Sequence, residues 1–166
     1  MTIELKEYQA DWSKMFHREK ELILKEVGAW LNGSVEHVGS TAVPGMLAKP
    51  TIDIMFGVRS LKHAEPAIDI LQRIDYCYYP YKSDVMHWFC KPSPELRTFH
   101  LHLVPYKSDL WQERIRFREI LIGQPEIALR YAKLKRTLVE EEPTDRDAYT
   151  RKKWLFIKKV LRDERC

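Results

Sequence analysis

The sequence predicts an α+β domain, with a mixed β-sheet flanked by helices and a helical C-terminal part, and three observations predict it. Apolar residues recur at helical spacing near the start of the chain. Short runs rich in β-branched and aromatic residues then alternate with turn residues, as in the strands of a sheet. Amphipathic segments return in the last third. At 166 residues the chain has the length of one domain, so we expect residues 1–166 to form a single unit.

The first third of the chain predicts a helix, two strands and a second helix. Trp12, Phe16 and Ile23 belong to an apolar stripe at helical spacing, which Gly33 interrupts. Two β-branched runs follow, and Ser60 is a suitable N-cap for the next helix. In order, we expect a helix at 11–31, strands at 35–38 and 51–58, and a helix at 60–74.

The middle of the chain predicts an antiparallel meander, and the remainder predicts helices. Three strand-like runs are separated by turn-forming segments at 82–84 and 91–95. Ser108 or Asp109 can cap the helix that follows, Gly123 ends it, and Pro125 suits the first turn of the next. We expect strands at 76–81, 85–90 and 97–104, then helices from 108 or 109 to 122, at 125–142 and at 145–162.

Composition limits where the protein acts and what it binds. No apolar run approaches the length of a membrane span, and the N-terminus is too polar for a signal peptide, so we expect a cytoplasmic protein with no membrane partner. Cys77, Cys90 and Cys166 are odd in number and far apart, which favours reduced thiols. The net charge is +4, and the basic surplus lies in the last third. It faces either phosphates or, in the plainer interpretation, solvent.

The loop between the strands at 35–38 and 51–58 has the residues of an anion site. Gly39 allows a sharp turn and a close approach to a ligand, while Ser40 and Thr41 bring hydroxyl and N–H groups. Lys49 could meet a phosphate or neutralise Asp53, or it could lie in solvent. Asp53 stands inside an apolar strand, where a carboxylate is costly to bury without a metal, a cation or hydrogen bonds.

This stretch resembles a known signature. A hydrophobic residue, Gly39 and Ser40, followed by 12 residues and then Asp53 in a strand, resembles the polymerase-beta-like nucleotidyltransferase superfamily. The fuller run GSTAVPG, AKP and IDI is more specifically similar to the GrpB family, and the similarity covers nearly the whole chain. The resemblance implies a nucleotidyltransferase-like mixed sheet flanked by helices.

The resemblance also implies a metal site, from which this chain departs. In the superfamily, two carboxylates two residues apart on one strand hold the metal ions that bridge the triphosphate. Asp53 supplies the first, but Met55 occupies the second position and is a poor ligand for Mg²⁺. His100 and His102 alternate with apolar residues, so they share one sheet face. With Asp53 they could hold Mn²⁺ or Zn²⁺ better than Mg²⁺; the alternative is that they bind nothing.

Basic residues on the C-terminal helices are further candidates for phosphate binding. Arg118, Lys135 and Lys153 match basic positions of the family, and Lys135 and Lys153 each share a helix face with a tyrosine four residues earlier. We expect these charges to point at the phosphates of whatever the loop binds. Surface ion pairing is the alternative.

The sequence therefore predicts a metal-dependent nucleotidyltransferase-like protein that acts on a nucleoside triphosphate and an acceptor. Gly39 and Ser40 would hold the phosphates and Asp53 the metal ion, while His100 and His102 are the only candidates for a general base. A first alternative is a non-catalytic module that binds a nucleotide or phosphorylated metabolite. A second is binding of nucleic acid by the basic helices, with an affinity that falls steeply with salt.

Overall fold

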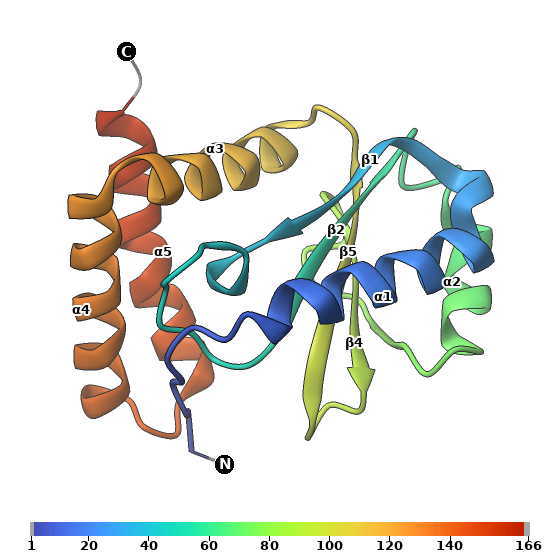
Figure 1. The fold of residues 1–166 in the computed structure, drawn as a ribbon. Helices are drawn as coiled ribbons and strands as arrows, with labels where there is room; N and C mark the ends of the chain where they lie inside the picture. Colours follow the sequence, from blue (N-terminus) through green and yellow to red (C-terminus); the bar gives the residue numbers. More distant parts are fainter. Residues whose placement is uncertain (1, 165–166) are drawn as a thin grey trace.

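The computed structural model describes residues 2–164 and confirms the predicted mixed α+β architecture. A five-stranded sheet is flanked by helices, and the chain ends in three consecutive helices (Figure 1). The described elements are α1 (Asp11–Val27), β1 (Leu31–Val38), β2 (Ile52–Val58), α2 (Glu65–Gln72), β3 (Cys77–Tyr79), β4 (His87–Pro92), β5 (Arg97–Pro105), α3 (Asp109–Gly123), α4 (Pro125–Glu141) and α5 (Arg146–Asp163). None of the described helices combines the length and hydrophobicity that crossing a membrane requires.

The strand order is β1-β2-β5-β4-β3, and the central pair is the parallel one. β1 pairs antiparallel with β2, and β3, β4 and β5 form the predicted antiparallel meander. In the central pair Asp53 lies opposite His100, and Met55 lies opposite His102. Because side chains alternate between the two faces of a strand, all four residues project to the same face of the sheet.

The opposite face of the sheet packs against α1 and α2. Phe16 and Ile23 of α1 and Leu71 of α2 belong to the same buried cluster as Ile54, Phe56 and other inward residues of the sheet. This is the helical stripe that the sequence predicts. The packing leaves the face with Asp53 free to meet the C-terminal helices.

The C-terminal helices form their own apolar cluster beside the first face. Phe117, Tyr131 and Ile157 bring α3, α4 and α5 together, and Val43 and Met46 of the loop after β1 join them. The loop is therefore anchored to the helices as well as to the sheet. Figure 1 shows α3, α4 and α5 gathered at one end of the molecule, beside that loop.

Several predicted boundaries are wrong, chiefly at the start of the chain. The helix predicted at 11–31 ends at Val27; residues 28–30 form a 3₁₀ turn, and Leu31 begins β1 by pairing with Val58. The helix predicted at 60–74 is only α2, because Ser60 caps a turn instead, accepting a hydrogen bond from the His63 N–H at 3.0 Å. Long-range pairing and local turns outweigh helical periodicity here.

The meander is also shorter and shifted. The strand predicted at 76–81 is reduced to three residues, and the strand predicted at 85–90 begins two residues later. The predictions for β5 and the C-terminal helices differ from the structure by one or two residues at most. Cys77 and Cys90 are free thiols, as predicted, while Cys166 lies outside the described residues.

Helix α5 carries side chains of the candidate site, and the hydrogen bond that caps its first turn can be tested by mutation. The Asp145 carboxylate caps it by accepting the Ala148 N–H at 2.9 Å. We expect Asp145→Ala to lower the free energy of unfolding by about 1 kcal/mol, measured by urea denaturation, because that N–H loses its partner. Asp145→Ser should keep most of the stability. Equal losses in the two variants would contradict a capping role.

Candidate functional site

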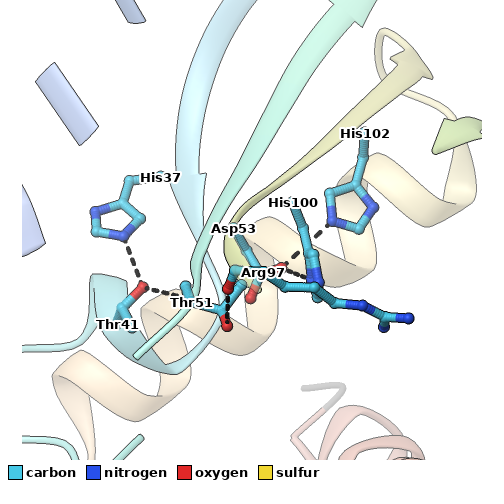
Figure 2. A network of polar contacts seen from close by, with 7 residues as sticks. All are labelled: His37, Thr41, Thr51, Asp53, Arg97, His100 and His102. Carbon is cyan, nitrogen blue, oxygen red and sulfur yellow. Dashed lines mark hydrogen bonds and ion pairs between the residues drawn. The ribbon is translucent and has the colours of Figure 1, made fainter. Parts of the chain in front are cut away.

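A carboxylate and two imidazoles meet on the face of the central strand pair that lies opposite α1 and α2 (Figure 2). Asp53 Oδ1 lies 3.2 Å from His100 Nδ1 and 3.5 Å from His102 Nε2. One ligand atom from each residue lies within 4.8 Å of the other two. The β2/β5 register produces this arrangement. Asp53 is paired with His100, and His102 lies two residues further along β5, on the same face of the sheet. The structure thus brings together the three residues that the sequence singles out, and their role as metal ligands stays a prediction.

The histidines determine the charge state of the site. Burial alone raises the pKa of Asp53, but the hydrogen bonds and charges of His100 and His102 outweigh it and hold that pKa well below its usual range. Burial, reinforced by the charge of Arg114, lowers the pKa of His102 to about 4. At neutral pH the site therefore offers an ionised carboxylate and a neutral imidazole, which are the protonation states that bind metal ions.

The loop after β1 is held against Asp53 by its first glycine. Gly39 has a φ of +74°, and a Cβ at this position would lie 2.6 Å from Asp53 Oδ2. Glycine is thus required both for the left-handed backbone and for the close approach. The next residue, Ser40, starts a 3₁₀ turn.

A chain of hydrogen bonds fixes the far side of the loop (Figure 2). His37 Nε2 lies 2.9 Å from Thr41 Oγ1, which donates to the Thr51 carbonyl at 3.4 Å. Thr51 in turn donates to the Arg97 carbonyl at 2.8 Å, on β5. The predicted ligand-binding hydroxyl of Thr41 is therefore used to hold the loop. His37 faces α1, where it stacks on Phe16 at 4.8 Å.

Lys135 of α4 is the most deeply buried charge-bearing residue of the site. Its side chain is 1% exposed, and its Nζ donates to Ser40 Oγ at 2.9 Å and to the Leu47 carbonyl. Burial, reinforced by the charges of Lys153, Lys49 and Arg136, lowers its pKa to about 6. Lys135 thus lies beside the loop that the sequence predicts as an anion site, and its contact with phosphate stays a prediction.

Two further lysines flank a tyrosine in the same region. The Nζ atoms of Lys49 and Lys153 lie 5.0 Å and 5.1 Å from the centre of the Tyr149 ring. Burial lowers the pKa of both lysines, and for Lys153 the result is about 7. Tyr149 is 0% exposed, yet its hydroxyl has no hydrogen-bond partner within residues 2–164. A buried hydroxyl without a partner is costly, so this corner is suited to an acceptor such as a phosphate oxygen.

These groups line one cleft of about 590 Å³ between the sheet and helices α3 to α5. Gly39, Ser40, Thr41 and Asp53 contribute from the sheet side, opposite Lys135 and Lys153. Arg118 is absent from this lining and does not occupy its predicted place. Its Nη1 binds Glu36 Oε2 at 3.1 Å and the His37 carbonyl at 2.9 Å, which fixes the end of β1. For Arg118, ion pairing was the correct alternative.

Sequence reasoning missed several residues that line the cleft. Arg114 lies one turn before Arg118 on α3 and contributes an Nε without a hydrogen-bond partner. In the sequence prediction, Tyr149 is only the tyrosine that shares a helix face with Lys153, not a candidate for ligand binding. Spacing on a helix says which residues share a face, but not which end of that face reaches the cleft. Trp88 and Arg97 also line the cleft, and no motif in the sequence singles them out.

Comparison with known proteins identifies the family. A family model described as GrpB protein matches residues 2–163. The chain belongs to the GrpB family. It is 32% identical over 163 residues to the glutamate-rich protein GrpB of Alkalihalophilus pseudofirmus, covering 94% of this chain and 92% of that protein. The sequence resemblance to GrpB is thus confirmed.

Solved structures agree with this assignment. The crystal structure of the conserved protein GrpB from Enterococcus faecalis has a TM-score of 0.87 and 30% sequence identity, over 96% of each chain. A chain in the structure of a GLD-2/RNP-8 complex has a TM-score of 0.58 and 12% identity, over 96% of this chain and 61% of that one. At that identity the second similarity concerns the fold alone.

The close approach of Gly39 to Asp53 is open to a matched test. We expect Gly39→Ala to lower the free energy of unfolding by about 1–3 kcal/mol and to displace Asp53, because the new methyl group meets the carboxylate. The measurements are urea denaturation and binding of Mn²⁺ followed by calorimetry.

Gly45→Ala is the control for this substitution. Gly45 also has a positive φ, +81°, but a Cβ there would meet nothing within 4 Å. Its replacement should cost stability through the backbone alone and leave the metal-binding affinity unchanged. Loss of Mn²⁺ binding in both variants, or in neither, would contradict the steric role of Gly39.

The lowered pKa of Lys135 predicts how stability depends on pH. In the unfolded chain this amine binds a proton up to about its ordinary pKa of 10.5, but in the folded protein only below about 6. Raising the pH from 7 to 9 therefore favours the folded state, by up to about 1.4 kcal/mol per pH unit. We expect Lys135→Met to reduce the slope measured by urea denaturation. Lys133→Met, which removes an exposed lysine of the same helix, should leave it unchanged; equal slopes in all three proteins would refute the prediction.

Proposed function

We propose that the cleft binds a nucleoside triphosphate with one divalent metal ion, and that the protein is a nucleotidyltransferase-like member of the polymerase-beta-like superfamily. The observation that carries this proposal is the presence, in one cleft, of a carboxylate with two imidazoles beside a pocket of three lysines around Ser40 and Tyr149. The first group suits a metal ion and the second suits phosphates.

The pocket around Ser40 supports phosphate binding. Lys49, Lys135 and Lys153 come from the loop, α4 and α5, and burial weakens the proton affinity of each amine. A bound phosphate would restore that affinity, because an opposite charge stabilises the ammonium form. Tyr149 offers a hydroxyl and Arg114 an Nε that have no hydrogen-bond partner among the described residues. Several donors thus converge where an anion would be held.

The donor set of Asp53, His100 and His102 fits a single metal ion. Two imidazoles and one carboxylate suit Mn²⁺ or Zn²⁺ better than Mg²⁺, which prefers oxygen ligands. The ring nitrogens turned toward Asp53 would be the ligands, and the opposite nitrogens, His100 Nε2 and His102 Nδ1, have no hydrogen-bond partner in the part of the chain that the structure describes. Such an ion would polarise a phosphoryl oxygen and neutralise charge.

The residues of the chain have distinct tasks in the proposed transfer. Ser40 and the lysines hold the β- and γ-phosphates, which leave together as pyrophosphate when an acceptor oxygen attacks the α-phosphorus. His100 and His102 would hold the metal ion through the nitrogens nearest Asp53, so these nitrogens cannot also accept the acceptor's proton, which would pass to solvent water. Positioning and charge stabilisation supply most of the catalysis in reactions of this type.

Met55 favours a second candidate function, which is binding without turnover. It occupies the strand position of a second carboxylate, it is 0% exposed, and it packs with Val38 and Trp88. Within the described residues, the group that could hold a metal contains one carboxylate, Asp53. A module of this kind would retain the metal and the nucleotide but release them unchanged. The nucleic-acid alternative has less support, because the basic residues named above line a cleft rather than an open surface.

Thermal unfolding tests both parts of the site. Metal-stripped protein is heated with Mg²⁺, Mn²⁺ or Zn²⁺, alone and with each nucleoside triphosphate. A ligand that binds the folded state at 100 times its dissociation constant adds about 2.7 kcal/mol, and so raises the midpoint by about 5–10 °C. We expect Mn²⁺ or Zn²⁺ with a triphosphate to give the largest shift in the wild type.

The variants separate specific binding from general stabilisation. Asp53→Ala and His102→Ala should abolish the shift that requires metal, while His63→Ala, which removes an exposed histidine outside the triad, should retain it. Release of pyrophosphate in the presence of an acceptor would distinguish transfer from binding alone. If no metal and triphosphate combination moves the wild-type midpoint, the proposal is wrong.

A further inference from the structure

Aromatic side chains line one side of the cleft. Neither the proposed phosphate binding by the three lysines nor the proposed metal binding assigns them a role. Tyr79, Tyr81 and Trp88 come from β3, the β3–β4 connection and β4, and we call them the aromatic wall. The ring centroids of Tyr79 and Tyr81 lie 6.0 Å and 6.1 Å from that of Trp88. Tyr79 and Tyr81 are 43% and 46% exposed. Adjacent exposed aromatic rings at a cleft are typical of a ligand contact.

The strand register places the aromatic wall beside the metal ligands. Tyr79 is paired with Trp88, and Trp88 is paired with His102, so the three residues form one row across the sheet. The Trp88 ring also lies 5.1 Å from the His100 ring. Neighbouring strands are about 4.8 Å apart, so the wall lies one to two strand spacings from the metal ligands. That span is comparable to the ribose that separates a base from its α-phosphate.

The cleft side opposite the wall provides another ring. Trp154 of α5 lines the cleft, and Lys82 Nζ lies 5.5 Å from the centres of both the Tyr81 and Trp154 rings. Arg97 Cζ lies 5.5 Å from the centre of the Trp88 ring. Cations therefore contact ring faces within the cleft. Lys82 is exposed, and its side chain occupies the place beside the Tyr81 and Trp154 rings where a planar group could enter.

We propose that the aromatic wall, with Trp154 across the cleft, is the subsite for the base of a nucleotide whose phosphates occupy the lysine pocket. This inference rests on the proposed function and gives its ligand a defined orientation, with the base at β3 and β4, the metal ligands next to it and the phosphates at α4 and α5. Stacking is available to every base, because each has a π-face. The wall therefore distinguishes nucleotides from inorganic polyphosphates and sugar phosphates, rather than one base from another.

The experiment compares ligands that share the phosphates but differ in the base. Adenosine triphosphate, cytidine triphosphate and inorganic tripolyphosphate are each titrated, with Mn²⁺, into the wild-type chain in a calorimeter. Loss of one stacking contact weakens nucleotide binding by about fivefold to about 100-fold. We expect both nucleotides to bind more tightly than tripolyphosphate by a factor in this range. Tyr81→Ala should reduce that factor while leaving the affinity for tripolyphosphate unchanged.

Two further variants control for effects on folding. Leu155→Ala removes an apolar side chain of α5 that is 68% exposed and outside the cleft lining, and it should leave all three affinities unchanged. Trp88→Phe keeps an aromatic ring in the wall and should retain the preference for nucleotides. Adenosine triphosphate, but not tripolyphosphate, should quench the tryptophan fluorescence of the wild-type chain. This quenching should be weaker in Trp88→Phe.

The outcomes separate this inference from the proposed function. If tripolyphosphate binds as tightly as the nucleotides, or if Tyr81→Ala weakens all three ligands equally, the aromatic wall is not a base subsite, although the phosphate site stands. If neither tripolyphosphate nor a nucleotide binds, the proposed function fails and this inference fails with it.

Discussion

The parallel pairing of β2 with β5 is the constraint on which the rest of the site depends. It aligns Asp53 with His100 across one strand spacing and brings His102 to the same carboxylate oxygen. Because side chains alternate along a strand, a slip of one residue would turn Asp53 to the face covered by α1 and α2. The apolar residues between these polar ones, such as Ile54 and Leu101, are fully buried on that other face and hold the register. The core thus determines the geometry of the site.

Much of the fold could be predicted because local signals and tertiary structure agree. The stripe of α1, the cap of α3 and the alternation of β5 all depend on nearby residues. Predictions failed where a distant partner decides the conformation. Leu31 continues the helical period, yet its pairing with Val58 makes it the first residue of β1. The ends of β3 likewise follow from its pairing with β4, and those of β4 from its pairing with β5, which no short window of sequence contains.

The candidate site divides in the same way. Asp53, His100 and His102 could be predicted together because two of them alternate on one strand and the third follows a recognisable loop. Helical spacing identified a face of α3, and Arg118 was predicted to reach the cleft from it. Arg114, one turn earlier on the same face, lines the cleft instead. The aromatic wall could not be anticipated, since its row across the sheet exists only once three strands are in register. The identity of a residue can be read from the sequence directly, but its neighbours across a sheet depend on strands that are distant in the chain.

The N-terminal segment before α1 is tied into this arrangement. The Ile3 N–H donates to the Pro143 carbonyl at 2.7 Å, and Lys6 forms a bridge with Ala48, next to the loop that holds Ser40. The cleft therefore draws on segments separated by most of the sequence, and such contacts form late and slowly in folding. Any intermediate that lacks α4 and α5 would also lack the lysine pocket. A ligand of the cleft should consequently slow amide hydrogen exchange in the central strands as well as at the cleft, since those amides open through the unfolding that destroys it.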